Sequence, residues 1–256
     1  MSAAPVYVLN LARSPERRAF MLDVCARAGV VAEFVAAIDG RACRSSATAL
    51  SKAETALILS HRKAWRKLLA GRDDFAVVLE DDVHLGEGFA ALIASDWAGL
   101  AFDVIKLETM FHRPLVARSG ARLGDRTLRR LRSEHVGAAG YVISREGARK
   151  LLRSTRRLDE PVDQTIFGRR AIRRGEIIAY QLVPAIVVQD NLRPAGRAGL
   201  ATTLHEPDRA ALAEDARRAK PRGMQRLRRE AARLGMRLAD AARAWTTCRR
   251  LRPDWR

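Results

Sequence analysis

Short apolar runs that read as strands alternate, along the first 190 residues, with segments of helical periodicity. The strand candidates cover residues 5–11, 33–40, 75–82, 102–108, 135–144 and 177–190. Between several of them, residues 15–28, 52–69 and 145–152 repeat apolar side chains at helical spacing. This alternation constrains the fold, because parallel neighbouring strands need a crossover between them, usually a helix. It predicts an α/β chain with a mostly parallel central sheet and helices on both faces.

The strand candidate at 75–82 ends in three consecutive carboxylates. The run AVVL leads directly into Glu80, Asp81 and Asp82. Ligands of open α/β sheets bind beyond the carboxyl ends of the strands. Buried neighbouring negative charges are costly without a positive partner, and Mg²⁺ and Mn²⁺ prefer oxygen ligands and accept phosphate oxygens too. We therefore expect a divalent cation that binds a diphosphate, with Asp82 in direct contact, Asp81 in support and Glu80 orienting a neighbour. The alternative is a solvated acidic loop.

Length and composition favour one large α/β domain with an appendage. The chain has 256 residues, of which 48% are hydrophobic, enough for a sizeable core. Its three cysteines, Cys25, Cys43 and Cys248, have no metal-ligand spacing and no disulfide pattern. We see no signal peptide and no transmembrane run, so we expect a cytoplasmic protein.

The net charge of +18 indicates an anionic partner, although an arginine-rich genome is an alternative cause. We place a boundary after residue 204, because residues 205–256 hold 15 Lys and Arg against 7 Asp and Glu. In this tail, apolar side chains such as Leu234, Leu238 and Trp245 recur at helical spacing with arginines beside them. A basic amphipathic helix of this kind suits an anionic membrane surface. The alternative is that its apolar stripe packs back onto the domain.

Seven ordered blocks of this chain resemble glycosyltransferase family 25, which includes the lipooligosaccharide galactosyltransferases of Gram-negative bacteria. The blocks are VYVLNLARSPERR, AAIDG, LSKAETALILSHRKAWRKLL, AVVLEDDVHLGEGF, FDVIKLE, GAAGYVISREGARKLL and PVDQTIF. The resemblance covers roughly residues 5–190. It implies a GT-A-type nucleotide-sugar-binding fold over residues 1–204, a UDP-sugar donor, usually UDP-galactose, and a divalent cation held by the Glu-Asp-Asp block. It also implies inverting transfer, in which a carboxylate takes the proton of the acceptor hydroxyl.

Five residues near the predicted strand ends are candidates for donor binding. Asn10 and Arg18 lie where the first strand meets its helix, in a block that faces the nucleotide in the family. An arginine there can pair with a diphosphate or stack on uracil. Asp39 and Gly40 end the second strand candidate, and the Asp39 carboxylate could accept from a ribose or uracil; ordinary turn chemistry is the alternative. Glu54 belongs to a block that resembles the family's E…SH…W pattern.

Three further candidates lie in the second half of the domain. Gly140 belongs to a small-residue passage that allows a ligand close to the backbone, or else allows tight helix–sheet packing. Asp163 is the candidate general base or a ligand of the transferred sugar, and a helix N-cap is its alternative role. Asp190, at the end of the last strand candidate, or His205 could complete the metal site. For His61, a structural role is favoured over donor contact.

The function that these observations favour is metal-dependent transfer of a hexose, with galactose expected, from a UDP-sugar to a hydroxyl of a lipid-linked oligosaccharide. The expected location is the inner face of the inner membrane, where the tail would bind. Metal-dependent phosphoryl transfer is an alternative, because paired carboxylates with Mg²⁺ also serve that chemistry. A nucleic-acid-binding protein is a second one, but aromatic residues are only 5% of the chain and no stacking pattern accompanies the arginines, so no nucleic acid is expected.

Overall fold

The structure, a computed structural model, describes residues 3–43, 50–95, 97, 99–193, 195, 197–200, 234–235 and 238–256. Within these ranges the strands of the central sheet are β1 (Val6–Asn10), β2 (Ala32–Ala36), β3 (Phe75–Glu80), β5 (Val104–Lys106), β7 (Ala121–Leu123), β8 (Arg126–Arg130), β9 (Gly140–Ser144) and β10 (Ala179–Val183). Two short antiparallel pairs join β4 (Val83–Leu85) to β11 (Val187–Gln189), and β6 (Leu115–Ala117) to β12 (Cys248–Arg250). The helices are α1 (Pro15–Arg27), α2 (Lys52–Ala70), α3 (Phe89–Ile93), α4 (Arg145–Ser154), α5 (Val162–Phe167) and α6 (Arg169–Arg173), with short 3₁₀ turns η1 (Gly40–Ala42) and η2 (Asp190–Leu192).

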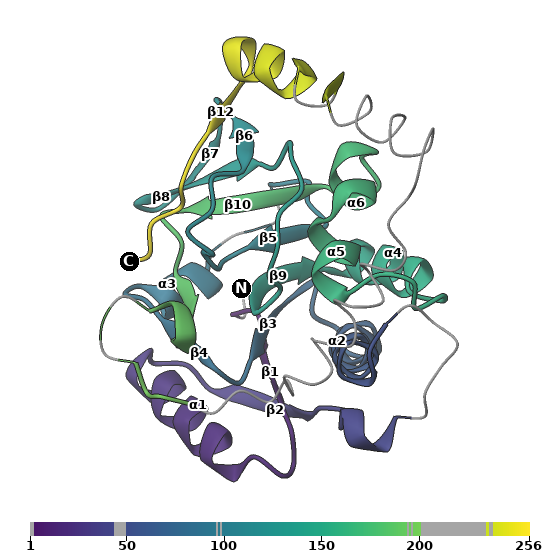
Figure 1. The fold of residues 1–256 in the computed structure, drawn as a ribbon. Coiled ribbons are helices and arrows are strands. Elements are labelled where there is room, and N and C mark those ends of the chain that lie inside the picture. Colours follow the sequence, from purple (N-terminus) through teal and green to yellow (C-terminus); the bar gives the residue numbers. More distant parts are fainter. Residues whose placement is uncertain are drawn as a thin grey trace.

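The central sheet has the strand order β2-β1-β3-β9-β5-β10-β8-β7 (Figure 1). The pairings β1–β2, β1–β3 and β5–β10 are parallel, whereas β9 and β8 run against their neighbours. All the strands except β8 and β9 therefore point the same way. The predicted α/β class with a mostly parallel sheet is confirmed.

Two helix layers cover the sheet, because alternate strand residues face opposite sides. Val8 and Val77 pack into a cluster with side chains of α1 and α3. Tyr7 and Val78, their neighbours in sequence, pack into a second cluster with side chains of α2, α4, α5 and α6. Figure 1 shows α1 and α3 on one side and the other helices on the opposite side. Both faces of the sheet are thus buried, which is why its central strands are apolar throughout.

The two longer helices start as the sequence indicates, but with different caps. Ser14 stands at the N-cap of α1, before Pro15, yet its hydroxyl makes no capping hydrogen bond. Ser51 and Glu54 form a reciprocal capping box at the start of α2. Such a box satisfies two of the free N–H groups at a helix start, so Glu54 helps to fix where α2 begins.

One edge of the sheet collects the carboxyl ends of its parallel strands. The chain leaves β1 for β2 on one side and returns to β3 on the other, so β1 and β3 flank a topological switch point. The carboxyl ends of β1, β2, β3 and β5 lie at this edge. Because β9 is antiparallel, its first residues lie there too. The acidic run after β3 therefore meets the segments that follow β5 and precede β9.

Residues 110–134 and the end of the chain form structure that the sequence reading did not predict. The basic segment after β5 contains β6, β7 and β8, and β7 and β8 close the sheet as an antiparallel hairpin. At the C-terminus, β12 pairs with β6, and Trp255 forms a bridge with Ala185. The last residues of the predicted helical tail are therefore extended and packed on the domain. The boundary at 204 stays a prediction, since residues 201–233 lie outside the described residues.

The described part of the tail keeps its apolar stripe in solvent. Residues 238–246 are helical, and Leu238 and Trp245 are 64% and 87% exposed. The alternative in which this stripe packs onto the domain is wrong for these side chains. On the inner side of the same helix, Asp240 is buried and pairs with Arg173 at 2.8 Å. In the described residues no helix is both long and apolar enough to cross a membrane.

Candidate active site

A pocket of about 590 Å³ opens at the edge where the strand ends meet. Its wall comprises residues after β1 and β2, the start of α2, the acidic run, the segment before β9 and the start of α5. The predicted site residues that line it are Asp39, Gly40, Glu54, Asp81, Asp82 and Asp163. The strand-end argument thus brings six residues from distant parts of the chain to one cavity.

Of the three carboxylates in the acidic run, Asp81 is the one whose charge and hydrogen-bonding capacity are met by neighbouring side chains. It is 7% exposed, and its oxygens accept from Asn10 Nδ2 at 2.8 Å and from Arg17 Nη1 at 2.5 Å. Asn10, itself buried, also donates to the backbone carbonyl of Ser14. Asn10 therefore holds Asp81 and does not line the pocket, so its predicted contact with the donor can only be indirect.

Asp82 and Glu80 are the two carboxyl groups of the acidic run that the fold pairs only weakly. Asp82 Oδ2 lies 3.4 Å from Arg17, but its buried Oδ1 has no hydrogen-bond donor among the described residues. Burial, reinforced by the Glu80 charge, raises the pKa of Asp82 to about 6 despite Arg17. Burial and then the carboxylates Glu108 and Asp81 raise the pKa of Glu80 to about 8. Burial and mutual repulsion therefore oppose the ionisation of both carboxylates.

A buried cluster of Trp65, Tyr141 and His61 lies behind Glu80. Trp65 Nε1 donates to the Tyr141 hydroxyl at 2.8 Å, and that hydroxyl lies 2.8 Å from His61 Nδ1. The other ring nitrogen, His61 Nε2, lies 3.6 Å from Glu80 Oε1, which is too far for a hydrogen bond, and it has no partner among the described residues. Burial lowers the pKa of His61 to about 3, so the ring is neutral. The favoured structural role of His61 agrees with this placement.

The arginine of α1 that reaches the pocket is Arg17, which corrects the choice of Arg18. The guanidinium of Arg18 lies 4.0 Å from the centre of the Phe34 ring, on the exposed side of the helix, outside the pocket wall. Successive helical residues are about 100° apart, so only one of the two can face the strand ends. Arg13 also lines the pocket and pairs with Asp39 at 2.6 Å.

Asp39, Gly40 and Glu54 lie together where η1 meets the start of α2. Asp39 caps η1 by accepting from the backbone of Arg41, and hydrogen bonds from Arg13 first and from this backbone second lower the pKa of Asp39. A Cβ on Gly40 would lie 3.1 Å from the backbone of Ala53, so glycine permits this close approach. Glu54 lines the pocket while one of its oxygens is held by the capping box.

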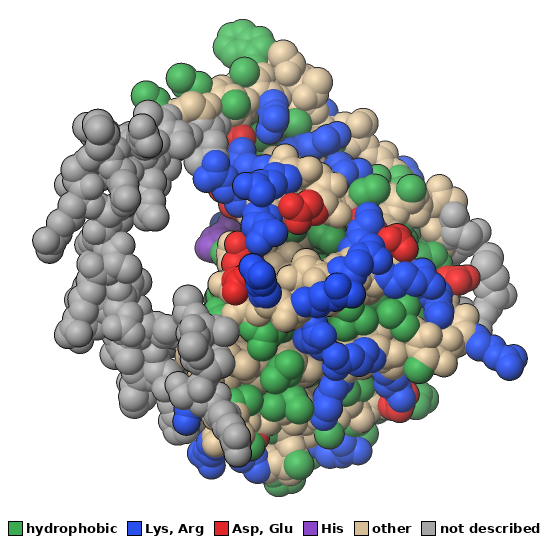
Figure 2. All heavy atoms as spheres, turned by 90° about the vertical axis from the view of Figure 1, so that its right-hand side faces the viewer, with side chains coloured by type: hydrophobic (Ala, Val, Ile, Leu, Met, Phe, Trp, Pro, Cys, Tyr) green, Lys and Arg blue, Asp and Glu red, His purple; other side chains and the backbone are tan. Residues whose placement is uncertain are grey.

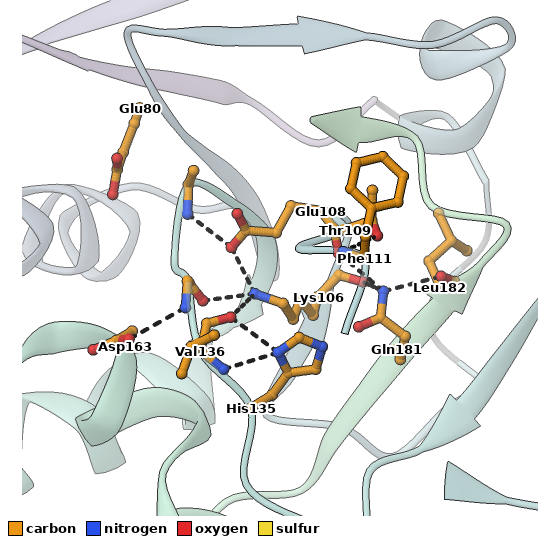
Figure 3. A network of polar contacts seen from close by, with 12 residues as sticks. Glu80, Lys106, Glu108, Thr109, Phe111, His135, Val136, Asp163, Gln181 and Leu182 are labelled. Carbon is orange, nitrogen blue, oxygen red and sulfur yellow. Dashed lines mark hydrogen bonds and ion pairs between the residues drawn. The ribbon is translucent and has the colours of Figure 1, made fainter. Parts of the chain in front are cut away.

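A fully buried ion pair shapes the opposite wall of the pocket (Figure 3). The Lys106 ammonium lies 2.6 Å from Glu108 Oε1 and also donates to the carbonyls of Val136 and Gly137, at 2.9 and 2.6 Å. Glu108 Oε1 in addition accepts from the backbone N–H of Ala139 at 2.9 Å. Lys106 and Glu108 are both 0% exposed. Their network fixes the backbone of residues 136–139, which contributes Val136, Gly137 and Ala138 to the pocket wall.

Asp163 is attached to that same wall. It lies in the first turn of α5, behind Pro161 at the N-cap position, so the N-cap alternative for Asp163 is wrong. Its Oδ2 accepts from the Gly137 N–H at 3.2 Å and its Oδ1 from the Gln164 N–H at 2.8 Å. Because each oxygen keeps a free lone pair, the carboxylate can still accept a proton from a ligand in the pocket.

Gly140 and Asp190 lie outside the pocket wall. A Cβ on Gly140 would come within 2.6 Å of the Val187 side chain, so the small residue serves packing against β11. The Asp190 carboxylate accepts from His84 Nε2 at 2.7 Å and from backbone N–H groups of residues 198–200. It thereby closes the loop after β11. His205, the other proposed third ligand, lies outside the described residues.

Comparison with known proteins identifies the family. A family model described as glycosyltransferase family 25 (LPS biosynthesis protein) matches residues 3–166. The chain belongs to glycosyltransferase family 25. It is 35% identical over 206 residues to the lacto-N-neotetraose biosynthesis glycosyltransferase LgtB of Neisseria gonorrhoeae, covering 72% of this chain and 74% of that protein. It is 32% identical to LgtE of the same organism, covering 72% and 73%, and 31% identical over 154 residues to the Haemophilus influenzae lipooligosaccharide biosynthesis protein lex-1, covering 55% and 50%.

Family membership makes the chain a glycosyltransferase and agrees with the expected GT-A-type α/β fold. In the described residues no cluster of three His, Cys, Asp or Glu forms a complete metal site. The residues nevertheless fit a hard divalent cation, because Asp82 Oδ1 is a buried oxygen without a partner and carboxylates outnumber arginines. Such a cation commonly takes its remaining ligands from water and substrate phosphates.

Three residues of the site were not among the sequence-based candidates for it. For α1 the sequence-based candidate is Arg18 and not its neighbour Arg17. Lys106 and Glu108 were read as part of a strand. A signal did exist, since two opposite charges two residues apart in a buried strand lie on the same face and must pair there.

Proposed function

We propose that this chain is a metal-dependent inverting galactosyltransferase that uses UDP-galactose and acts on a hydroxyl of lipooligosaccharide. The observation that carries the proposal is the acidic run Glu80–Asp82 in a pocket at the switch point of the sheet, with one buried Asp82 oxygen unpartnered. The names of the relatives, which refer to lacto-N-neotetraose and lipooligosaccharide biosynthesis, support the substrate class.

Asp82 is the residue that would hold Mn²⁺ or Mg²⁺, with Glu80 beside it. The bound cation supplies charge stabilisation for the leaving diphosphate. Asp81 does not need to bind it, because Asn10 and Arg17 already satisfy that carboxylate. Arg17 would instead fix the direction of the acidic run, and Arg13 and Asp39 would border the nucleotide.

Asp163 would act as the general base. An acceptor hydroxyl oxygen forms the new bond to the anomeric carbon while the bond from that carbon to the diphosphate oxygen breaks. UDP leaves with the electron pair of that bond, and the hydroxyl proton passes to a free lone pair of Asp163. The backbone N–H groups of Gly137 and Gln164 orient this carboxylate from behind. One displacement of this kind inverts the anomeric centre.

The tail would place the enzyme on the inner face of the inner membrane, where a lipid-linked acceptor is presented. Leu238 and Trp245 offer an exposed apolar stripe, and arginines such as Arg243 and Arg249 accompany it. Figure 2 shows many Lys and Arg side chains, and few acidic ones, among the hydrophobic side chains of the face that lies on the right in Figure 1. Apolar insertion combined with basic side chains is the pattern that binds anionic lipid surfaces.

A donor screen tests the activity. The full chain is incubated with UDP-galactose, UDP-glucose, GDP-mannose or CMP-sialic acid, with Mn²⁺ or with EDTA, and de-O-acylated lipooligosaccharide as acceptor. We expect UDP release and a hexose mass increase with UDP-galactose and Mn²⁺ only. Phosphate or nucleotide release without a heavier acceptor would favour phosphoryl transfer instead. Transfer that continues undiminished in EDTA would contradict the proposed metal dependence.

Sedimentation with vesicles tests the membrane role. The full chain should bind phosphatidylglycerol vesicles more than phosphatidylcholine vesicles, and Trp245→Ser should weaken binding by about tenfold. Trp97→Phe, in the buried core, is the control for loss of a tryptophan. Equal binding by Trp245→Ser and by the unchanged chain would contradict this role.

A further inference from the structure

A second cavity, of about 250 Å³, lies beside the donor pocket. Val136 belongs to the wall of both cavities. Consecutive residues of α5 also divide between them, with Asp163 in the donor pocket and Gln164 in the second cavity. A molecule in the second cavity therefore lies next to the carboxylate that is proposed to deprotonate the acceptor.

Three polar side chains of this cavity are not engaged within the described part of the chain. His112, Arg113 and Gln164 line it, and none of their side chains makes a hydrogen bond or ion pair with another described residue. The His112 ring stacks on the buried His135 ring, with centres 6.3 Å apart, which fixes one wall. Guanidinium, imidazole and amide groups together form a surface suited to a polar ligand such as a saccharide.

The charges around the cavity leave an excess of arginine. Arg173 compensates both carboxylates of the wall, since it contacts Glu134 at 2.5 Å and Asp240 at 2.8 and 2.9 Å. Arg250 lies 4.0 Å from Asp240 and is half exposed. Arg113 is exposed and has no carboxylate partner among the described residues. An anionic group of a ligand would find Arg113 available, with Arg250, which also donates to the Arg113 carbonyl, beside it.

We propose that this cavity is the acceptor subsite and that it binds a saccharide residue bearing an anionic substituent, a carboxylate or a phosphate. Arg113 is the principal contact to the anion, and Gln164 contacts a neighbouring hydroxyl. This inference rests on the proposed function, because it supplies the acceptor to Asp163.

The C-terminal segment takes part in this subsite. Asp240 and Arg250 line the cavity, and they belong to the same segment that exposes Trp245. Acceptor binding and contact with a lipid surface would therefore use opposite sides of one short segment. A lipid-linked glycan bound in the cavity would have its lipid end within reach of the tail.

The test measures acceptor kinetics with UDP-galactose, Mn²⁺ and three probes: de-O-acylated lipooligosaccharide, the same material dephosphorylated with hydrofluoric acid, and the same material with its carboxyl groups reduced. Arg113→Gln should raise the acceptor KM roughly fivefold to tenfold, with kcat and the donor KM unchanged, because a charge-assisted hydrogen bond is lost. Arg113→Glu should raise it further. Arg157→Gln, an exposed arginine outside both cavities, is the matched control.

The probes distinguish the outcomes. If the effect of Arg113→Gln disappears on the dephosphorylated probe, the anion is a phosphate; if it disappears on the carboxyl-reduced probe, the anion is a carboxylate. An acceptor KM equal to that of the Arg157→Gln control, or an effect of the same size on all three probes, would overturn the anionic subsite while leaving the transferase activity intact. No hexose transfer by the unchanged chain to any probe would sink the proposed function itself.

Discussion

Two clusters of buried charge border the donor pocket, and they differ in balance. Lys106 and Glu108 are completely buried, pair at 2.6 Å, and use the remaining ammonium hydrogens on two backbone carbonyls. The run Glu80–Asp82 has three carboxylates against the guanidinium of Arg17. The first cluster is neutral within the fold, whereas the second carries excess negative charge in the described structure.

The difference separates a structural role from a binding role. A charge-balanced pair that also binds backbone groups can hold backbone in place, and breaking it leaves an uncompensated buried charge. An unbalanced cluster lowers stability, so it persists where a ligand supplies the missing charge. Changes in the two clusters should therefore move stability and activity in opposite ways.

The largest effect is expected for Asp82→Asn. Removing this carboxylate should lower Mn²⁺-dependent transfer by about a thousandfold, as for loss of a main electrostatic contact to the transition state. The metal-free protein should be at least as stable as before, because a destabilising charge is gone. Initial rates, together with urea unfolding without metal, check both statements. Retained activity would show that Asp82 does not bind a catalytic metal ion. A large loss of stability would show that Asp82 has a structural role like that of the Lys106–Glu108 pair.

Asp163→Asn should come next, since Asp163 is held by the wall that the Lys106–Glu108 pair shapes. We expect kcat to fall about 100-fold, within the range for a general base, because the amide cannot take the hydroxyl proton. Binding of UDP-galactose with Mn²⁺, followed by the shift in unfolding temperature, should be nearly unchanged. A parallel loss of kcat and donor affinity would reassign Asp163 to recognition of the sugar.

Lys106→Met should act mainly on stability. It leaves Glu108 buried without its partner, so the free energy of unfolding should fall by about 3 kcal/mol. Adding Glu108→Gln should restore part of this loss, because the uncompensated charge is then removed. Lys63→Met, which loses a single exposed bond to the Ala36 carbonyl, is the control. Equal, small losses for the two lysines in urea titrations would show that the buried pair is not required.

The sequence predicted the unbalanced cluster but not the balanced one. The alternation of strands and helices placed the end of β3 at a ligand-binding edge. The three consecutive acidic residues at that position can be read directly from the sequence. Glu108, the partner of Lys106, is also close in sequence. The role of this pair, however, depends on its contacts with residues 136–139. That segment reaches the same edge only because β9 is antiparallel, and strand direction cannot be read from the apolar run GYVIS.

The choice between Arg17 and Arg18 failed for a different reason. Adjacent helical positions differ by about 100°, and the apolar pattern of α1 is too irregular to fix its orientation within that angle. Likewise, β12 pairs with β6 across more than a hundred residues of chain, and local propensity carries no information about such a partner. Local patterns therefore gave the elements, and tertiary packing decided which side chains share the pocket.

The pH dependence of stability should also distinguish the clusters. The pKa of Glu80 is raised to about 8 and that of Asp82 to about 6, so the metal-free folded state binds protons more tightly than the unfolded chain. Their stabilising contribution is complete below the ordinary carboxyl pKa values and is lost as pH rises towards 8.

We therefore expect the free energy of unfolding of the metal-free protein to fall by several kcal/mol between pH 5 and pH 8. Saturating Mn²⁺ should remove most of this slope, and Asp82→Asn should reduce it. Urea titrations at several pH values measure the slope. Stability that rises over this interval without metal would contradict the placement of the two carboxylates.

The smallest effect is expected at a third charge pair, Arg173 and Asp240, which tests whether balance matters equally near the surface. Hydrogen bonds from Arg173 lower the pKa of Asp240, so the contribution of this pair is present at neutral pH and is lost only as the pH falls through that lowered value. Asp240→Asn should cost about 1 kcal/mol, because the amide oxygen can still accept from Arg173 and because Arg173 keeps its contact with Glu134. Hydrogen exchange should accelerate in residues 238–247 and stay unchanged in β3 and β9. Acceleration that spread to the sheet would mean that the tail helix unfolds together with the core. The Arg173–Asp240 pair would then matter for the stability of the whole domain, as the Lys106–Glu108 pair does.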